Sequence, residues 1–325
     1  MSAHVKPPTG LDGAGLLVVD KSGGVTSHDV VSACRKALKT RRVGHAGTLD
    51  PMATGVLVLG VERATKMLGL LSLTTKEYTA TIRLGSATTT DDAEGETVSR
   101  ADASAVTDVD IDSAVAALTG EISQVPSSVS AIKVDGKRAH ALVRDGETVV
   151  LEPRKVTVSR FDVLERRRVH IETGASETGA SETRASETGN TPLDLDVHVE
   201  CSSGTYVRAL ARDLGTALGV GGHLTALRRT RVGPFTLDHA RTLDELRDDP
   251  RVSLDIDAAA RTAFPHRDVT DDEAESLSQG RWLDPVGIAG VYAAVNPAGH
   301  TIALVQERGK RASTVMVVRP ATLRD

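Results

Sequence analysis

The stretch Gly44-His45-Ala46-Gly47-Thr48-Leu49-Asp50-Pro51-Met52-Ala53-Thr54-Gly55 lies between two helical patterns and combines three glycines with one histidine, one aspartate and one proline. A proline disfavours helical backbone at the residue before it, so Asp50 is predicted to be extended, with its carboxylate projecting from a loop. The glycines permit positive φ angles or close approach of another backbone. The spacing leaves two interpretations open: an Asx-turn that joins two elements, or a loop that presents a functional carboxylate.

Length and charge limit the possible classes of protein. The chain has 325 residues, enough for a large domain and a small one. Its net charge of -5 argues mildly against a nucleic-acid partner, but the charges are segregated along the chain. Basic residues cluster at 35–42 and 208–231, and acidic residues at 91–96, 108–112, 243–249 and 271–275. Local basic patches on an acidic protein remain compatible with a phosphate backbone as partner.

Cysteine usage and hydropathy indicate a cytoplasmic protein. Cys34 and Cys201 each fall in an apolar pattern, so both thiols are predicted to be buried in a reducing compartment. No Cys/His spacing typical of a metal site is present, and we expect no metal and no cofactor. Residues 1–13 are polar and are predicted to form a flexible arm. No apolar run approaches the length needed to span a membrane, so no membrane association is expected.

Periodicity places several elements around the opening stretch. Residues 15–20 are predicted to form a buried strand, and Thr26 or Ser27 can cap the helix that follows. Residues 77–84 alternate as a strand with Tyr78 on its apolar face, where a core tyrosine is the simplest interpretation. Asp110 or Asp112 is expected to begin a helix that Gly120 ends.

Later segments are more varied. Residues 124–147 are basic, and could form a flap over a polyanion or an ordinary surface excursion.

Residues 174–188 repeat a five-residue polar unit, which predicts a disordered insertion at a hairpin tip, over about 172–190. Arg208 and Arg212 lie one helical turn apart, and are either a salt-bridged pair or cations aimed at a carboxylate or phosphate. A capping box at Thr270 and Glu273 and short strands predict a small β-rich domain at 255–325.

Six stretches in order carry a resemblance to a known family. GHAGTLDPMATGVL (44–57) closely resembles the signature of the TruB family of tRNA pseudouridine-55 synthases. Five more stretches match: DK followed by GVTS (19–27), KEY (76–78), QVPSSVSAIKVDGKRAH (124–140), CSSGTYVRALARDLG (201–215) and GGHLTALRRTRVGPF (221–235). The match covers nearly all of residues 14–236. Ser22, Thr89 and His140 depart from the usual family residues, and the repeat is an insertion.

The resemblance implies an α+β fold. Residues 14–250 would form the catalytic domain, a mixed, largely antiparallel sheet with flanking helices, and residues 255–325 a small PUA-like RNA-binding domain. A thumb loop at about 124–152 would clamp the RNA. Asp50 would be the catalytic residue. The implied substrate-binding residues are His45, which would fill space in the RNA beside the extruded base, Tyr78, which would stack on the uracil, Asp92 in a polar network, Arg208, which would pair with Asp50, and Leu227 in the base pocket. The candidates for contacts with the RNA backbone are Lys21, Arg42, Lys133, Arg138 and Arg229.

The chemistry of this reaction suits those residue types. Isomerising uridine to pseudouridine breaks the N1–C1′ bond and rejoins the uracil through C5, without a redox step or an activated water, so neither cofactor nor metal is required. It needs an ionised carboxylate, as nucleophile or as base at the sugar, and a neighbouring arginine stabilises that charge and fixes its direction. An aromatic face can hold the detached uracil, which must first leave its stack.

The predicted function is therefore isomerisation of uridine 55 in the T loop of tRNA by a monomer that needs no obligate protein partner. The alternative is a non-catalytic RNA-binding protein or tRNA-folding chaperone on the same scaffold, which has no need for Asp50, Tyr78 and Arg208 together. A third hypothesis, an aspartate-dependent hydrolase, lacks a second acid/base partner near the loop, since Asp91 and Asp92 lie in an ordinary polar stretch.

Overall fold

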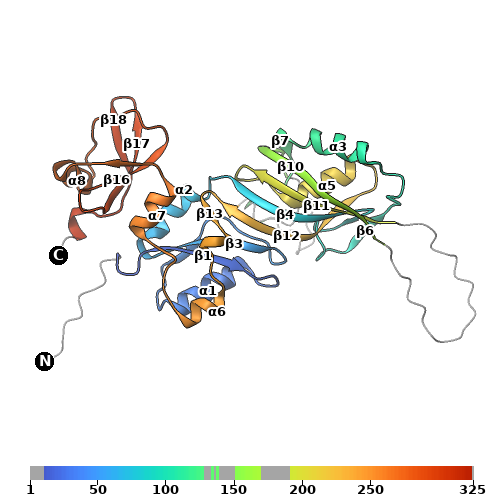
Figure 1. The fold of residues 1–325 in the computed structure, drawn as a ribbon, viewed down its shortest axis with the longest axis horizontal. Helices are drawn as coiled ribbons and strands as arrows, with labels where there is room; N and C mark the ends of the chain where they lie inside the picture. The colour runs from blue at the N-terminus through green and yellow to red at the C-terminus, as the bar shows by residue number, and fades with distance from the viewer. Residues whose placement is uncertain (1–10, 128–132, 135–136, 139–150, 170–190, 324–325) are drawn as a thin grey trace, which may run out of the picture. The chain divides into compact units, whose positions relative to one another are not determined.

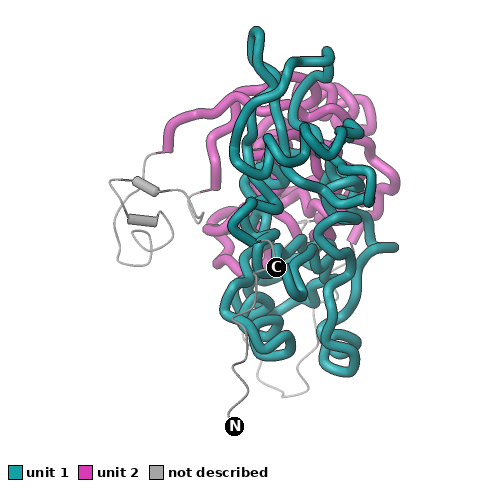
Figure 2. The backbone as a smooth tube through the Cα atoms, turned by 90° about the vertical axis from the view of Figure 1, so that its left-hand side faces the viewer, with its two compact units in different colours: residues 1–74, 230–325 teal, residues 75–229 magenta. Residues whose placement is uncertain are grey.

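The computed structural model describes residues 11–127, 133–134, 137–138, 151–169 and 191–323. The repeat at 174–188 and most of the predicted arm and thumb lie outside these residues. The chain divides into two compact units, residues 1–74 with 230–325 (unit 1) and residues 75–229 (unit 2), which are coloured in Figure 2. Each unit is described by itself.

Unit 1 combines the N-terminal and C-terminal parts of the chain (Figure 1). Its elements are β1 (Gly15–Lys21), α1 (Ser27–Ala37), β2 (Val43–His45), β3 (Thr54–Val61), η1 (Glu62–Met67), α2 (Leu68–Leu71), β13 (Phe235–Thr236), η2 (Leu237–His239), α6 (Leu243–Asp248), β14 (Leu254–Asp255), α7 (Ile256–Ala263), β15 (His266–Asp268), α8 (Asp271–Ser278), β16 (Val291–Val295), β17 (Thr301–Arg308), β18 (Arg311–Val317) and η3 (Ala321–Leu323).

The strands β1 and β3 pair antiparallel and are buried on both faces, which explains their nearly continuous apolar sequence. Successive side chains of a strand point to opposite faces. Leu17 and Leu59 therefore pack on one side with α1 and α6, whereas Val18 and Val58 pack on the other with η1, α2 and α7. Figure 1 shows α1 and α6 below these strands and α2 and α7 above them. The predicted buried strand at 15–20 is confirmed.

A capping box begins α1. The Thr26 hydroxyl accepts from the backbone N–H of Asp29 (3.1 Å), and the Asp29 carboxylate accepts from the backbone N–H of Thr26 (2.9 Å). These bonds satisfy donors that a helix leaves free at its first turn. Of the two predicted caps, Thr26 is the one used. The predicted capping box of Thr270 and Glu273 is confirmed at the start of α8.

The C-terminal strands form a four-stranded sheet of their own, in the order β15-β16-β17-β18. Its pair β15–β16 is parallel and the other pairs are antiparallel. One face of this sheet contacts α8, and Ala293, Leu304 and Met316 on the other face join the core around β1 and β3. The carboxylate of Asp257 on α7 accepts from the backbone N–H of Thr301 (2.7 Å) and from both terminal nitrogens of Arg319 (2.6 and 2.8 Å). This fork fastens the last strands to α7.

Unit 2 contains the elements β4 (Lys76–Leu84), β5 (Ser86–Thr88), β6 (Thr97–Arg100), α3 (Asp108–Ala117), β7 (Gly120–Gln124), β8 (Lys133–Val134), β9 (Lys137–Arg138), β10 (Arg154–Arg168), β11 (Leu193–Cys201), α5 (Val207–Ala217) and β12 (Gly222–Val232), whose last residues reach unit 1. Its strands follow the order β12-β4-β11-β10-β7, and β4, β11, β10 and β7 pair antiparallel. The helix α3 packs against α5 and β10, and α5 packs against β4. The predicted α+β class, with a mixed, largely antiparallel sheet and a separate small C-terminal sheet, is confirmed.

One helix begins earlier than predicted. The sequence favoured Asp110 or Asp112 as the start of α3, but the helix begins at Asp108 and is capped by Thr107. Asp110 is instead the third residue of a capping box, where its carboxylate accepts from the backbone N–H of Thr107 (3.1 Å). Threonine and aspartate both cap helices well, so composition alone does not decide between them.

The fork between Asp257 and Arg319 is expected to stabilise unit 1. In a double-mutant cycle of Asp257→Ala, Arg319→Ala and the double variant, urea denaturation should give a coupling free energy of about 2 kcal/mol. The matched control is the exposed pair Asp244–Arg247, whose side chains are 85% and 65% accessible. Its coupling should be about 0.3 kcal/mol. Equal coupling in the two cycles would contradict the structural role of the fork.

Candidate active site

The loop that carries Asp50 is fastened on both sides of that residue. The Ser27 hydroxyl, at the start of α1, accepts from the backbone N–H of Leu49 and donates to the carbonyl of Leu49, both at 2.9 Å. The carbonyl of Pro51 accepts from the backbone N–H of Gly24 (2.9 Å) and from the Lys21 ammonium (3.0 Å). The backbone of Asp50 is therefore held between two anchored neighbours.

The glycines of this loop serve the two purposes that the sequence suggested. Gly47 and Gly55 have φ angles of 89° and 101°, which side chains rarely tolerate. Gly44 lies where a Cβ atom would come within 3.0 Å of a methyl group of Leu68. The backbone of Asp50 accepts from the N–H of Ala53 (3.1 Å), so a turn is also present. The turn and a presented carboxylate are thus compatible.

Lys21 is the buried cation beneath this loop. Its side chain is fully buried, and its ammonium group donates to the carbonyls of Ser22 (2.9 Å), Val25 (2.7 Å) and Pro51 (3.0 Å). A buried charge is tolerated only when hydrogen bonds replace its hydration. The ammonium group faces carbonyls inside unit 1, and the contact of Lys21 with the RNA backbone stays a prediction.

In unit 2, two apolar side chains of the predicted base pocket lie on the strands of the sheet. Tyr78 on β4 is 7% exposed and lies opposite Val199 of β11, on the same face as Ala80 and Ile82. Leu227 on β12 is also 7% exposed. The predicted position of Tyr78 on the apolar face of its strand is confirmed.

Arg208 binds the turn that connects β5 and β6. Its Nη1 atom donates to the carbonyl of Thr90 (2.9 Å) and to the hydroxyl of Ser127 (3.4 Å), and lies 3.5 Å from a carboxylate oxygen of Asp92. Arg208 and Asp92 are 5% and 3% exposed. A second oxygen of the Asp92 carboxylate accepts from the Thr90 hydroxyl (2.5 Å) and from the backbone N–H of Glu94 (3.1 Å). The pair is thus buried and hydrogen-bonded, as such charges must be.

The start of α5 is fixed by Gln124 at the end of β7. The Gln124 side chain accepts from the backbone N–H of Tyr206 (2.8 Å) and donates to the carbonyl of Tyr206 (3.1 Å). Ser127 follows and donates to the carbonyl of Thr90 (3.3 Å). Sequence reasoning did not single out Gln124, Ser127 or Thr90, because polar residues with such spacing are usually solvated. The family-like block QVPSS contains Gln124 and Ser127, and no sequence signal pointed to Thr90.

Lys76 and Arg229 bring two further cations into the interior of unit 2. Burial, followed by the positive charge of Arg229, lowers the pKa of Lys76 to about 8. Arg229 is 1% exposed, and its contact with the RNA backbone stays a prediction. Arg42 remains compatible with such a contact, because its side chain is 70% accessible and only loosely paired with Glu62 at 3.7 Å.

The remaining candidates are placed only in part. Lys133 on β8 lies opposite Arg138 on β9 in the backbone register. His45 is the last residue of β2, opposite Leu59 of β3. Asp50 and His45 belong to unit 1, and Tyr78, Asp92, Arg208 and Leu227 to unit 2. Of the predicted site residues, those that the structure brings together are Asp92 and Arg208; the meeting of Asp50 with Arg208 and Tyr78 stays a prediction.

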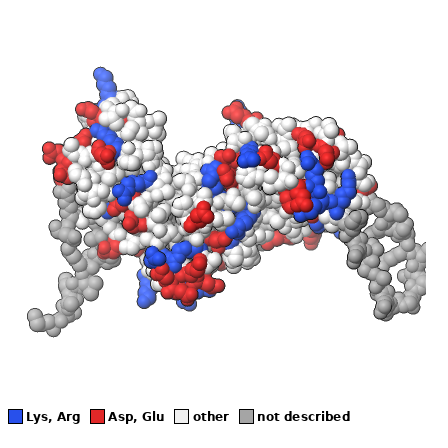
Figure 3. Space-filling view, in the orientation of Figure 1, with Lys and Arg blue, Asp and Glu red and all other residues white. Residues whose placement is uncertain are grey.

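Much of the positive charge on the described surface is paired. Figure 3 shows lysine and arginine side chains interspersed with aspartate and glutamate on the face in view. On β10, Arg166 pairs with Asp108 and Asp112, and Arg167 with Asp196. Within the described part of the chain, no group of three metal-ligating side chains is present, and no helix is both long and apolar enough to cross a membrane.

Three family models match the chain. Residues 35–207 match "TruB family pseudouridylate synthase (N terminal domain)", residues 208–255 match "tRNA pseudouridylate synthase B C-terminal domain", and residues 264–319 match "tRNA Pseudouridine synthase II, C terminal". A protein from Rhodococcus jostii (strain RHA1) named tRNA pseudouridine synthase B is 71% identical over 100% of both chains. One of the same name from Nocardia farcinica (strain IFM 10152) is 67% identical, covering 96% of this chain and 95% of the relative.

Solved structures share the fold. A chain of the "Crystal Structure of a Cbf5-Nop10-Gar1 Complex" aligns with a TM-score of 0.67 at 25% identity, over 98% of this chain and 89% of that one. A chain of the "Structure of H/ACA RNP bound to a substrate RNA containing 2'-deoxyuridine" has a TM-score of 0.66 at 23% identity, over 98% and 90%. The fold and the sequence matches together define a pseudouridine synthase, which confirms the predicted enzyme class. The chain belongs to the TruB family of pseudouridylate synthases.

Removing the ammonium group of Lys21 is expected to destabilise unit 1. In Lys21→Met, the carbonyls of Ser22, Val25 and Pro51 lose a charged donor. The free energy of unfolding, measured by urea denaturation, should fall by about 3 kcal/mol. The control is Lys66→Met, an exposed lysine of η1, which should change it by less than about 0.5 kcal/mol. Similar values for the two variants would refute the anchoring role of Lys21.

The lowered pKa of Lys76 predicts a pH dependence of stability. Between about pH 8 and the ordinary lysine value of 10.5, the unfolded chain holds a proton that the folded chain releases. Stability from this group therefore rises with pH in that window and is lost on acidification. Urea denaturation at pH 8 and pH 10 should show a larger gain for the wild type than for Lys76→Met. Burial raises the pKa of Cys34 to about 12 and that of Cys201 to about 11, and both thiols oppose this trend. The contribution of Cys34 cancels in the comparison, whereas Cys201 interacts with the charge of Lys76, so its contribution differs between the two proteins.

Proposed function

We propose that the protein isomerises uridine to pseudouridine at position 55 in the T loop of tRNA, with Asp50 as the catalytic carboxylate. The observation that carries the proposal is the anchoring of Leu49 and Pro51 on either side of Asp50. Catalytic groups gain most from being held in position before the substrate arrives. The family and the names of the relatives support tRNA as the substrate.

The proposed roles follow the order of the reaction. The target base leaves its stack at a cost of a few kcal/mol, and His45, five residues before Asp50, fills the vacated space. Asp50 acts at the sugar as the N1–C1′ bond breaks, and Arg208 stabilises its charge. Tyr78 and Leu227 hold the detached uracil while C5 turns towards C1′. Atoms and oxidation state are conserved, so the proposal includes no cofactor.

The buried pair of Arg208 and Asp92 supports this assignment. A guanidinium group that is 5% exposed and tied to a turn by several contacts has little freedom to point elsewhere. Such a cation suits a carboxylate partner better than a phosphate on the outside of an RNA. The proposal accordingly places Arg208 beside Asp50 when the tRNA is bound.

The remaining parts are assigned to RNA binding. The thumb at about 124–152 would clamp the T arm, and the C-terminal sheet at 255–325 would act as a PUA-like RNA-binding domain. The residues from 14 to 250 would form the catalytic domain. The protein would act as a monomer in the cytoplasm, where its substrate is found, without an obligate protein partner.

The catalytic assignment is tested by Asp50→Asn. In a T-arm minihelix, its single-turnover rate should fall by at least about 10³-fold, because the charge that acts at the sugar is lost. Binding of the minihelix, measured by fluorescence anisotropy, should stay within about twofold. The control Asp272→Asn, an exposed aspartate of α8, should retain full activity.

Release of tritium from C5 of labelled uridine provides the readout, since reattachment through C5 displaces that hydrogen. Full activity of Asp50→Asn would overturn the proposed role of Asp50. No release by the wild type at saturating protein would instead favour the tRNA-folding chaperone. A minihelix with cytidine in place of the target uridine should bind and give no product.

A further inference from the structure

Arg212 lies on α5 one helical turn after Arg208 and uses its three side-chain nitrogens. Its Nη2 atom donates to the carbonyl of Val125 (2.7 Å), its Nη1 atom lies 3.3 Å from a carboxylate oxygen of Asp91, and its Nε atom donates to Asp213 (2.9 Å). The side chain of Asp91 is 13% accessible and that of Arg212 27%. The contact therefore differs from a solvated surface pair, which contributes little.

Arg208 and Arg212 on α5 contact three consecutive residues of the turn, 90 to 92. Arg208 binds the carbonyl of Thr90 and the carboxylate of Asp92, and Arg212 binds the carboxylate of Asp91 between them. The same Arg212 also fixes Val125, two residues before Ser127, which bonds to Thr90. The polar environment of Arg208 is thus shared with Arg212 through the turn and through the end of β7.

Asp91 occupies the turn in an unusual backbone conformation. Its φ angle is +61°, in the left-handed region, which aspartate and asparagine adopt more readily than other residues with a side chain. The carbonyl of Asp91 accepts from the backbone N–H of Leu224 (3.0 Å), and this bond connects the turn to β12. Burial raises the pKa of Asp91, and the charge of Arg212 opposes that effect most strongly. Without Arg212, the buried carboxylate would lose its main cation.

We infer that Arg212 and Asp91 are positioning residues for Arg208, and that their ion pair sets the direction of the Arg208 guanidinium group during uridine isomerisation. The inference rests on the proposed function, in which Arg208 stabilises the catalytic carboxylate. If the pair is broken, the buried carboxylate of Asp91 loses its main cation, and the turn can move outwards to solvate it. Thr90 and Asp92 then move away from Arg208, and a displacement of about 1 Å in a catalytic group can slow a reaction about 100-fold.

The geometry favours this role over direct binding of RNA by Arg212. Its three nitrogens already contact Asp91, Val125 and Asp213, so a phosphate would have to replace an existing partner. A residue that binds phosphate contributes to affinity, whereas a positioning residue contributes to the rate of the chemical step. The two roles therefore predict different results for the same variant.

Three variants test separately the charge of the ion pair and the length of the side chain at position 212. Arg212→Met keeps the length of the stem and removes the charge, and Arg212→Lys keeps the charge but cannot reach Asp91 and Val125 together. Asp91→Asn keeps a residue that tolerates positive φ and removes the charge. With the full-length protein and a T-arm minihelix, the single-turnover rate should fall by about 10-fold to 100-fold in Arg212→Met and Asp91→Asn, and by less in Arg212→Lys. The dissociation constant should stay within about twofold of the wild type.

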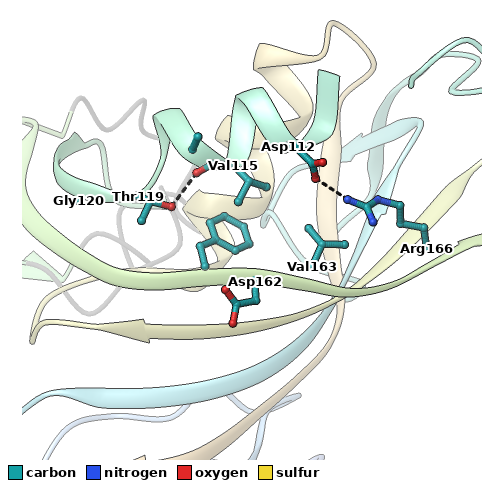
Figure 4. Close-up of a pocket in the computed structure, with 9 residues that line it drawn as sticks. Asp112, Val115, Thr119, Gly120, Asp162, Val163 and Arg166 are labelled. Carbon is teal, nitrogen blue, oxygen red and sulfur yellow. Dashed lines mark hydrogen bonds and ion pairs between the residues drawn. The ribbon is translucent and has the colours of Figure 1, made fainter. Parts of the chain in front are cut away.

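The matched control is Arg166→Met. Arg166 also bridges two acidic side chains of unit 2, Asp108 (3.2 Å) and Asp112 (2.5 Å), and Figure 4 shows it beside the groove between α3 and β10. That groove, of about 700 Å³, is lined by α3, β10 and the residues just after α3, and the turn at 90–92 is not part of its lining. The side chains of Asp108 and Asp112 are 77% and 67% accessible, so this variant should lower the melting temperature only slightly and leave the rate within about twofold. It separates a specific effect of Arg212 from the loss of any arginine–aspartate bridge in unit 2.

The results distinguish the possible outcomes. Slower chemistry with unchanged affinity in Arg212→Met and Asp91→Asn supports the inference. A rate within twofold of the wild type in a folded Arg212 variant overturns it, as does weaker binding at an unchanged rate, which would make Arg212 a contact for RNA. Arg212→Lys keeps the test decisive if Arg212→Met does not fold. Full activity of Asp50→Asn would count against the proposed function alone, because it leaves the variants of Arg212 unaffected.

Discussion

The ammonium group of Lys21 imposes the constraint on which the loop around Asp50 depends. Leaving water is costly for a positive charge, and the cost is offset only if several acceptors surround it. In this protein the acceptors are main-chain carbonyls from the turn after β1 and from Pro51. Strand β1, the start of α1 and the loop must therefore lie together. The antiparallel pairing of β1 with β3, which places Lys21 opposite Gly55, fixes the same arrangement from the other side.

Unit 2 applies the same principle with a guanidinium group. Arg208 is buried, and its contacts come from a turn between two strands and from residues that follow β7. A planar guanidinium group has several donors in fixed directions, so each partner restricts its orientation further. Both buried cations lie at the ends of regular elements, where backbone carbonyls and side chains from distant parts of the chain can meet. The fold thus creates rigid polar sites without metal-ligand clusters among the described residues.

The sequence predicted those features that depend on local patterns. Alternation placed Tyr78 on the apolar face of β4, and the spacing of Thr270 and Glu273 identified the start of α8. It did not reveal which cations are buried. Lys21 and Arg229 were named as candidates for contacts with the RNA backbone, yet both side chains are buried, that of Lys21 against the carbonyls of Ser22, Val25 and Pro51. The partners of Asp91 and Asp92 on α5 are distant in the chain, so the acidic loop that contains these two residues does not reveal them.

The composition of the core around β1 and β3 has a consequence for synthesis of the chain. One face of these strands is covered by α1, whereas the opposite face contacts η1 and α2, which follow β3 at once, and α7, about 200 residues later. A ribosome adds ~5–20 residues per second, so the part of that face that contacts α7 lacks this partner for roughly 10–40 s after β3 emerges. The core on this face of β1 and β3 is therefore completed only when α7 has been synthesised.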